Sequence, residues 1–196
     1  MRLVVGITGA TGAIFGIRLL ELLRDLEVET DLCISRWGAR TIEHETAFSV
    51  SRVAALATRA YAAGDQSAPI SSGSHRTDGM IIAPCSMRTT AAIAHGLADN
   101  LVTRAADVVL KERRRLAILA RESPLSEIHL ENLLRLSRLG VVVMPPVPAF
   151  YAHPDSIADL VDHILMRTLD QFGLRVDAQP RWSGALLRRV TSGEVS

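Results

Sequence analysis

The sequence predicts one α/β domain built on an open, doubly wound parallel sheet with helices on both faces. Short apolar runs alternate with stretches of helical periodicity along the chain, which is the order of a βαβα protein. The apolar runs are continuous, as expected for strands buried on both faces, and no Asn-Gly hairpin signal separates them. The length of 196 residues fits one domain and is too short for a (β/α)₈ barrel of roughly 250 residues.

Five strands are predicted from apolar runs that are rich in β-branched or aliphatic residues and are bounded by turn residues. They cover residues 3–7, 30–34, 80–83, 116–120 and 141–144. Six helices are predicted from helical periodicity, several of them preceded by Ser, Asp or Asn at the capping position. They cover residues 13–26, 38–45, 86–94, 100–112, 128–138 and 155–172.

Two segments are less regular than the rest of the chain. Residues 49–74 are expected to form a surface excursion with a short helix at 53–58. Residues 174–196 are expected to form a C-terminal tail, of which residues 181–196 fold over another surface or fray.

Composition narrows the class of function. Hydrophobic residues make up 48% of the chain and aromatic residues 4%, so the core must be aliphatic. The net charge of +1, with no long run of one sign, disfavours a nucleic-acid groove or a membrane-surface helix. The apolar stretch 3–16 contains four glycines and has no basic region beyond Arg2, so it is interpreted as neither a signal peptide nor a membrane span.

The cysteines and histidines argue against a disulfide framework and a metal centre. Cys33 and Cys85 lie in apolar runs, where a small buried side chain and a reducing cytoplasm are the simplest interpretation. The six histidines show neither H-x-H nor H-x-x-x-H spacing, so no metal site is predicted.

The loop after the first strand is a candidate phosphate loop, because ligands of open α/β sheets bind at the carboxyl ends of the strands. Residues 8–12 read Thr-Gly-Ala-Thr-Gly, and Gly16 follows inside the helix. Glycines let the backbone approach a phosphate, and the helix is expected to offer free N–H groups. The spacing is not G-x-G-x-x-G, so a purely structural strand-to-helix turn is the alternative.

Dinucleotide binding is disfavoured by two departures. Short-chain dehydrogenases have a similar glycine string and a Tyr-x-x-x-Lys pair, but here Asp107 stands four residues before Lys111. The second strand ends in Ser35-Arg36, where an NAD-binding fold places an acidic residue for the ribose.

A second anion site is predicted at residues 84–89, which read Pro-Cys-Ser-Met-Arg-Thr. Two hydroxyls and a guanidinium at a helix start suit a phosphate, and an ordinary Ser N-cap without a ligand is the alternative.

Arg121 and Glu122 follow the next strand, while Arg104 and Lys111 share one face of a predicted helix. We expect these charges to converge on a small phosphorylated substrate; ion pairs and a solvated helix face are the structural alternatives.

Lys111 is the single lysine of a chain that has 21 arginines. A chain that uses arginine almost everywhere can keep lysine where the function needs a compact, movable ammonium group, and Lys111 is the candidate for such a position. The alternative is that this lysine was kept by chance.

From residue 6 to residue 173, the sequence resembles the UbiX-type flavin prenyltransferases, including members that accompany hydroxyarylic acid decarboxylases. The strings that carry the resemblance are G-A-T-G at 9–12, S-S-G-S at 71–74, P-C-S at 84–86, R-A-A-D-V-V-L-K-E-R at 104–113, R-E at 121–122, I-H-L-E-N at 128–132 and P-P-V-P-A-F-Y at 145–151. Strings of this length are much more specific than a glycine motif.

The resemblance implies a Rossmann-like (flavodoxin-like) αβα fold, with residues 1–196 as one flavoprotein domain and 174–196 as its tail. It implies a cytoplasmic homo-oligomer, usually a dodecamer, that binds no nucleic acid or membrane. The implied reaction joins a dimethylallyl group from dimethylallyl monophosphate to N5 and C6 of reduced FMN without a metal. The product, prenylated FMN, would serve a UbiD-type decarboxylase.

Carried over position by position, the resemblance assigns three sets of residues. The FMN-binding set is Gly9, Ala10, Thr11, Ser35, Ser86, Met87, Arg88, Thr89 and Arg121. The substrate-binding set is Tyr151 and Arg167 for the phosphate, with Trp182 as an aromatic neighbour of the prenyl group. The catalytic set is Glu45, Lys111, Glu122 and Arg104.

The implied chemistry explains these residue types. Breaking the carbon–oxygen bond leaves negative charge on the phosphate, which cations must bind, and positive charge on the allyl group, which a π-rich face stabilises. Bond formation at C6 requires removal of a ring proton, which Glu45 and Glu122 are expected to handle.

Two departures from the family pattern and two rival functions stay open at this point. Thr11 stands where many members have Ser, and the segment before Ser71 lacks the Trp that some members place against the prenyl group. A non-catalytic FMN carrier subunit is one rival. A flavin-dependent cysteine decarboxylase is the other; it shares A-D-N-L at 98–101 but needs an Asn and a Trp that residues 145–151 lack.

Overall fold

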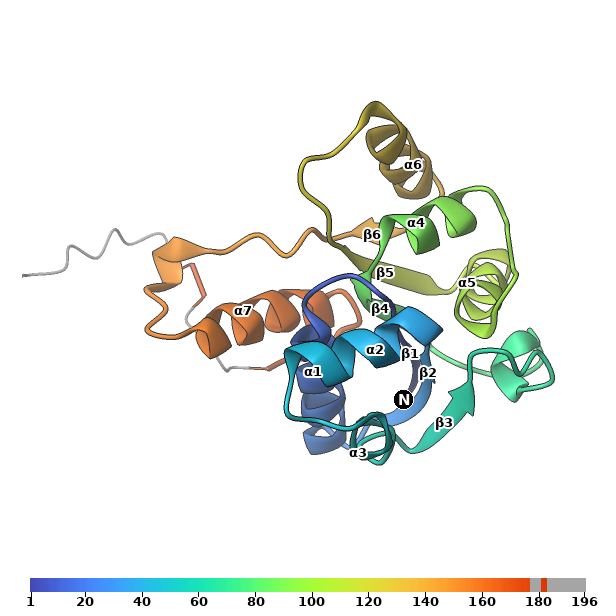
Figure 1. Ribbon diagram of the computed structural model, residues 1–196, viewed down its shortest axis with the longest axis horizontal. Helices are drawn as coiled ribbons and strands as arrows, with labels where there is room; N and C mark the ends of the chain where they lie inside the picture. The colour runs from blue at the N-terminus through green and yellow to red at the C-terminus, as the bar shows by residue number, and fades with distance from the viewer. Residues whose placement is uncertain (177–180, 183–196) are drawn as a thin grey trace, which may run out of the picture.

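The computed structural model describes residues 1–176 and 181–182 and contains one all-parallel sheet (Figure 1). Its strands are β1 (Arg2–Ile7), β2 (Glu29–Ile34), β3 (Arg59–Ala62), β4 (Gly79–Cys85), β5 (Arg115–Ala120) and β6 (Val142–Val143). The strand order is β3-β2-β1-β4-β5-β6, which reverses direction between β1 and β4 as in doubly wound nucleotide-binding folds. The predicted fold class is confirmed, while most of the predicted tail lies outside the described residues.

Helices cover both faces of the sheet and complete three layers (Figure 1). They are α1 (Ala13–Asp25), α2 (Arg36–Glu45), α3 (Val50–Ala54), α4 (Met87–Ala94), α5 (Leu101–Lys111), α6 (Glu127–Arg138) and α7 (Ile157–Asp170), with 3-10 turns η1 (Pro69–Ser71) and η2 (Phe150–Ala152). Helices α1, α2, α3 and α7 pack on one face, and α4, α5 and α6 pack on the other. Among the described residues, no helix has the length and apolar character needed to cross a membrane.

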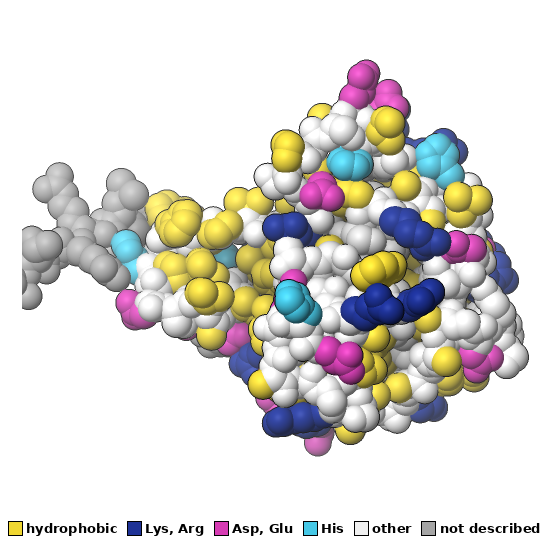
Figure 2. Space-filling view, in the orientation of Figure 1, with side chains coloured by type: hydrophobic (Ala, Val, Ile, Leu, Met, Phe, Trp, Pro, Cys, Tyr) yellow, Lys and Arg dark blue, Asp and Glu magenta, His cyan; other side chains and the backbone are white. Residues whose placement is uncertain are grey.

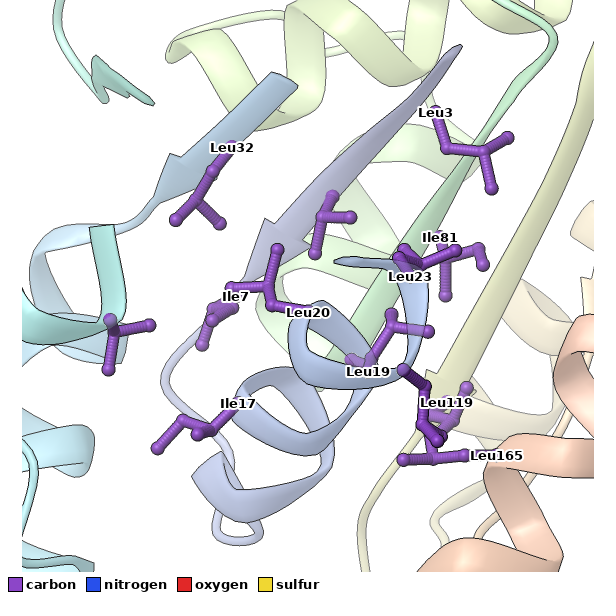
Figure 3. Packing of buried hydrophobic residues seen from close by; sticks show 14 of the residues in the cluster. Leu3, Ile7, Ile17, Leu19, Leu20, Leu23, Leu32, Ile81, Leu119 and Leu165 are labelled. Atoms are coloured by element: carbon purple, nitrogen blue, oxygen red, sulfur yellow. The ribbon is translucent and has the colours of Figure 1, made fainter. Parts of the chain in front are cut away.

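Two aliphatic cores result from the alternation of side chains along buried strands. In β1, Leu3, Val5 and Ile7 face the α1 layer, while Val4 faces the α5 layer. Figure 3 shows leucines and isoleucines of β1, β4, α1 and α7 meeting in the first of these cores. Burial on both faces explains why the apolar runs of β1, β4 and β5 are continuous.

The main element that the sequence analysis missed is β3, an edge strand of four residues whose side chains alternate between half-buried and exposed. Such a strand has no continuous apolar run, so it left no signal in the pattern used to find the others. The short helix predicted at 53–58 forms at Val50–Ala54, because Ser49 accepts a hydrogen bond from the N–H of Arg52 and so begins the helix earlier. The strand predicted at 141–144 is shorter in the structure and covers only Val142–Val143.

Gly16 lets α1 lie directly on the sheet. A Cβ at this position would collide with the carbonyl oxygen of Ala83 in β4 and would lie 2.7 Å from Ile7 Cγ1 in β1. The glycine is therefore required for close helix–strand packing, which is one of the roles that glycines have in this type of fold.

Replacing Gly16 by Ala is expected to destabilise the protein even though Ala favours helices. The helix propensity gain is about 1 kcal/mol, whereas overpacking against backbone costs about 1–3 kcal/mol. Gly64→Ala is the matched control, since a Cβ there meets no atom within 4 Å. Urea unfolding checks both variants; a Gly16→Ala protein as stable as the wild type would contradict the packing argument.

Candidate functional site

An open cleft of about 490 Å³ lies at the carboxyl edge of the sheet, where the strand order reverses. The residues around it come from the ends of β1, β2, β3 and β4 and from the loop before α5. They are Gly9, Ser35, Arg36, Trp37, Ala63, Gly64, Ser86, Arg88, Thr89, Asp99 and Asn100. Its volume lies in the range of small-molecule sites, and its position is the one at which doubly wound sheets bind ligands.

Thr8 joins the ends of β1 and β4 at the base of this cleft. Its buried hydroxyl donates a hydrogen bond to the carbonyl of Pro84 at 2.8 Å and accepts one from the N–H of Ser86 at 2.8 Å. The backbone N–H of Thr8 also donates to Pro84, and that of Ser35 donates to Ile7. The two helix starts that follow β2 and β4 are therefore fixed relative to β1.

Helices α2 and α4 both point their N-termini at the cleft. Ser35 caps α2 by accepting from the N–H of Gly38 at 3.0 Å, and Ser86 caps α4 by accepting from the N–H of Thr89 at 3.3 Å. The first N–H groups of a helix lack helical partners, and the helix dipole adds positive potential there. Two such ends beside one cleft make a strong anion-binding arrangement.

Arginine side chains increase the positive charge of the cleft. Arg36 begins α2 and Arg88 lies in the first turn of α4, and both line the cleft. Arg88 pairs with Asp99 at 2.6 Å, and this guanidinium holds the pKa of the Asp99 carboxyl below its ordinary value. Both side chains are largely exposed, so the pair restrains Arg88 with little effect on stability.

Gly9 allows α2 to approach the β1 loop. A Cβ on Gly9 would overlap Cβ of Trp37 and lie 3.2 Å from its carbonyl carbon. Trp37 stays 63% exposed on the cleft wall, and the Arg40 guanidinium lies 5.0 Å from the centre of its ring.

Glu45 corrects the expectation that the N-terminus of α1 is free. Its Oε2 accepts hydrogen bonds from the N–H groups of Gly12 at 2.8 Å and Ala13 at 3.0 Å, so the end of α2 caps α1. Desolvation favours the neutral form of Glu45, but hydrogen bonds from the Thr11 hydroxyl and these two amides hold its pKa below the ordinary value. The carboxylate thus occupies the amides that the glycine loop was expected to offer to a phosphate.

Ala10, Met87, Arg121 and Glu122 lie beside the cleft in different ways. Ala10 is buried, and the Met87 side chain packs into the core of the α4 layer, so neither side chain reaches into the open volume. The backbone N–H of Arg121 donates to the carbonyl of Cys85, the residue before Ser86, and this places Arg121 at the same edge of the sheet. The Arg121 residue is exposed there. Glu122 is also exposed and accepts a hydrogen bond from the N–H of Ser123.

Arg104 and Lys111 do not converge with this group within one chain, which corrects the expectation of a single cluster. Asn100, just before α5, lines the cleft, but α5 runs back across the sheet and carries Lys111 about 15 Å along its axis, to the edge where β5 begins. There Lys111 Nζ pairs with Glu112 at 2.5 Å. Arg104 donates to the Ser71 carbonyl at 3.1 Å and pairs with Asp107 at 2.7 Å.

Tyr151 lies on η2, in an arm (residues 145–157) that extends away from the sheet (Figure 1). Trp182 follows α7 in the sequence, and Arg167 lies near the end of α7, where the helix packs on the α1 face of the sheet. The Tyr151 and Trp182 rings meet edge to face with centroids 5.5 Å apart. Arg167 pairs with Asp170 at 2.7 Å. The structure therefore brings Tyr151 and Trp182 together, but on a different part of the chain from Ser35 and Ser86.

Several cleft residues were missed by the sequence analysis. Ala63 and Gly64 follow the unrecognised strand β3, so recognising that strand would have placed them at the carboxyl edge. Asp99 and Asn100 precede a helix that Asn100 caps, and Trp37 lies two residues after Ser35, which follows β2. A bulky aromatic beside a strand end was the available signal for Trp37.

Among residues 1–176 and 181–182, no group of three or more His, Cys, Asp or Glu side chains is arranged to hold a metal ion. The two cysteines are buried, and burial raises the pKa of each thiol to about 12.

Comparison with known proteins gives consistent matches over nearly the whole chain. Residues 1–169 match the model of the Flavoprotein family. A protein of Bacillus subtilis (strain 168), described as a probable UbiX-like flavin prenyltransferase, is 57% identical over 94% of this chain and 90% of its own length.

Two solved structures resemble this one closely. AnUbiX (PadA1), in complex with FMN and dimethylallyl pyrophosphate, has a TM-score of 0.93 at 54% identity, covering 94% of this chain and 98% of its own. A dodecameric FMN-dependent UbiX-like decarboxylase from Escherichia coli O157:H7 has a TM-score of 0.92 at 57% identity, covering 94% of this chain and 100% of its own.

Glu45→Gln is expected to reduce stability in a pH-dependent way. Because the folded pKa of Glu45 lies below its ordinary value of 4.5, its contribution is present in full above that value and is lost as the pH falls through the folded pKa. At neutral pH the loss is about 1 kcal/mol or less, since the side chain is exposed.

Urea unfolding at several pH values measures this effect. The difference between wild type and Glu45→Gln should be constant from neutral pH to about pH 5 and shrink below about pH 4. Glu43→Gln, an exposed position on the same helix, controls for the change in net charge. A difference that does not change with pH would contradict the capping role.

Proposed function

This chain belongs to the UbiX-like flavin prenyltransferases of the Flavoprotein family, and we propose that it joins a dimethylallyl group from dimethylallyl monophosphate to N5 and C6 of reduced FMN. The enzyme class follows from identity of 48–59% to named members over nearly the full chain. The observation that carries the specific reaction is the cleft between the N-termini of α2 and α4, whose donor groups fit a flavin monophosphate.

The described residues fit FMN in chemical type. Ser35, Ser86 and Thr89 supply hydroxyls beside two helix N-termini, and Arg88 supplies a cation, which together suit a phosphate dianion. Gly9, Ala10 and Thr11 form the β1 loop, where a flavin ring is assigned to lie. Reduced FMN supplies the nucleophilic N5 and C6 positions when bound.

The site becomes complete when a second copy of the chain supplies the arm. The arm exposes Val147, Phe150 and Ile157 to solvent at 68%, 72% and 79%, and Figure 2 shows hydrophobic side chains gathered on it. Apolar groups exposed this strongly on one projection favour an interface. The structurally similar E. coli protein is dodecameric, and we assign a homododecamer to this chain.

In this assembly the cations are assigned to the departing phosphate. Arg104, Lys111, Arg121 and Arg167 bind it together with the Tyr151 hydroxyl, and this stabilises the negative charge that develops as the carbon–oxygen bond breaks. Trp182 faces the allyl group, whose positive charge its π system stabilises. Glu45 and Glu122 hold and move the protons, including the one lost from C6.

The product and location follow from the same assignment. Prenylated FMN released by this enzyme would be used by a UbiD-type decarboxylase in the cytoplasm, where the two buried cysteines stay reduced. The chain carries out the reaction with protein side chains and no metal.

The test is anaerobic incubation of the purified protein with reduced FMN and dimethylallyl monophosphate, followed by mass spectrometry of the released flavin. We expect a gain of one five-carbon prenyl unit. Glu122→Gln should lower turnover by about 100-fold or more, as expected for loss of an acid–base group, while FMN binding is kept. Glu127→Gln, an exposed carboxylate five residues along, is the matched control.

Unmodified FMN returned with both the monophosphate and the diphosphate donor would contradict the prenyltransferase assignment. A non-catalytic FMN carrier would then explain the fold and the cleft, and in that case Glu122→Gln would have no effect on its function. Turnover with the diphosphate alone would change the donor and leave the enzyme class as it is.

A further inference from the structure

His163 contacts the hydroxyl of Tyr151 and is not one of the residues assigned to the reaction. It lies on α7, is 5% exposed, and its Nε2 is 3.2 Å from the Tyr151 oxygen. The two rings meet edge to face, with centroids 5.6 Å apart and planes at 84°. Trp182 makes a second edge-to-face contact with Tyr151, so the phenol ring is held by two neighbours.

The surroundings of His163 keep its imidazole neutral at physiological pH. Burial lowers the pKa of His163, and the positive charges of Arg167 and Arg181 lower it further. A neutral imidazole carries one N–H donor and one acceptor nitrogen. The hydrogen bond to Tyr151 can therefore run in either direction, depending on which ring nitrogen carries the hydrogen.

The direction of this hydrogen bond decides what Tyr151 can bind. A phenol has one hydrogen to donate, and a phosphate dianion offers only acceptors. If Tyr151 donated its hydrogen to His163, it would have none for a phosphate. If His163 donates through Nε2–H, the phenol hydrogen is free, and a hydrogen bond received at the oxygen strengthens the phenol as a donor.

The assignment of Tyr151 to the substrate phosphate favours the second direction, because only that direction leaves the phenol hydrogen free. Arg167, the guanidinium assigned to the same phosphate, lies four residues after His163 on α7 and so shares one face of the helix with it. Tyr151 is 45% exposed, and its oxygen is anchored by His163.

We propose that His163 is a positioning residue that donates its Nε2–H to the Tyr151 oxygen and thereby directs the phenol hydrogen to the phosphate of the dimethylallyl donor. This inference rests on the proposed function, because it requires Tyr151 to contact the substrate phosphate. His163 acts through Tyr151 and does not itself touch the substrate.

The experiment measures calorimetrically the affinity of the holoenzyme, loaded with oxidised FMN, for dimethylallyl monophosphate. Tyr151→Phe removes the hydroxyl, His163→Phe removes the N–H but keeps an aromatic ring, and His163→Gln keeps an amide N–H donor. Tyr61→Phe is the matched control, because it removes the hydroxyl of the only other tyrosine, which binds Asp31 on β2.

We expect Tyr151→Phe to weaken binding about tenfold or more, and His163→Phe to weaken it about three- to tenfold. The double variant should bind no more weakly than Tyr151→Phe alone, because His163 acts only through the hydroxyl. His163→Gln should recover most of the affinity, and the affinity for FMN should be unchanged in all variants. The Tyr61→Phe protein should bind like the wild type.

Wild-type affinity in His163→Phe would overturn the proposal, and so would additive losses in the double variant, which indicate a general structural effect. Equal losses in His163→Gln and His163→Phe would overturn it as well. Because oxidised FMN is used, binding is measured without turnover. The expected affinities together with unmodified flavin in the anaerobic assay would overturn the proposed reaction alone, whereas absence of donor binding to the wild type would overturn both.

Discussion

The hydroxyl of Thr8 holds together the part of the fold on which the site depends. At the one place where the strand order reverses, it bonds to Pro84 and Ser86, and so joins the end of β1 to the start of α4. Ser35, at the end of the neighbouring strand β2, donates its backbone N–H to the carbonyl of Ile7 in β1. As a result, the N-termini of α2 and α4 face one cleft, where the two helix dipoles favour an anion.

Glu45 disfavours an anion at the N-terminus of α1. A carboxylate at the end of α2 already satisfies the Gly12 and Ala13 amides. This carboxylate would repel a phosphate, whereas the N-terminal ends of α2 and α4 on the other side of the cleft would attract it. The same contact places Glu45 beside Thr11, at the loop where the flavin ring is assigned.

The fold was predictable because burial on both faces leaves a strong pattern: the runs that became β1, β4 and β5 are continuously apolar, and β2 is apolar from Leu32 to Ile34. The alternating edge strand β3 was not, and Ala63 and Gly64 were missed with it. Ser86 was found because capping is local in sequence. The partner of Glu45 and the distance of Lys111 from the cleft depend on how α2 and α5 pack, which spacing along the chain does not encode.

A crystal structure of the protein with FMN bound would locate the phosphate. We expect the phosphate to lie between the N-termini of α2 and α4, within hydrogen-bond distance of Ser35 and Ser86, with Glu45 still bonded to Gly12 and Ala13. A phosphate bound to the Gly12 and Ala13 amides, with Glu45 displaced, would contradict this placement of the anion site.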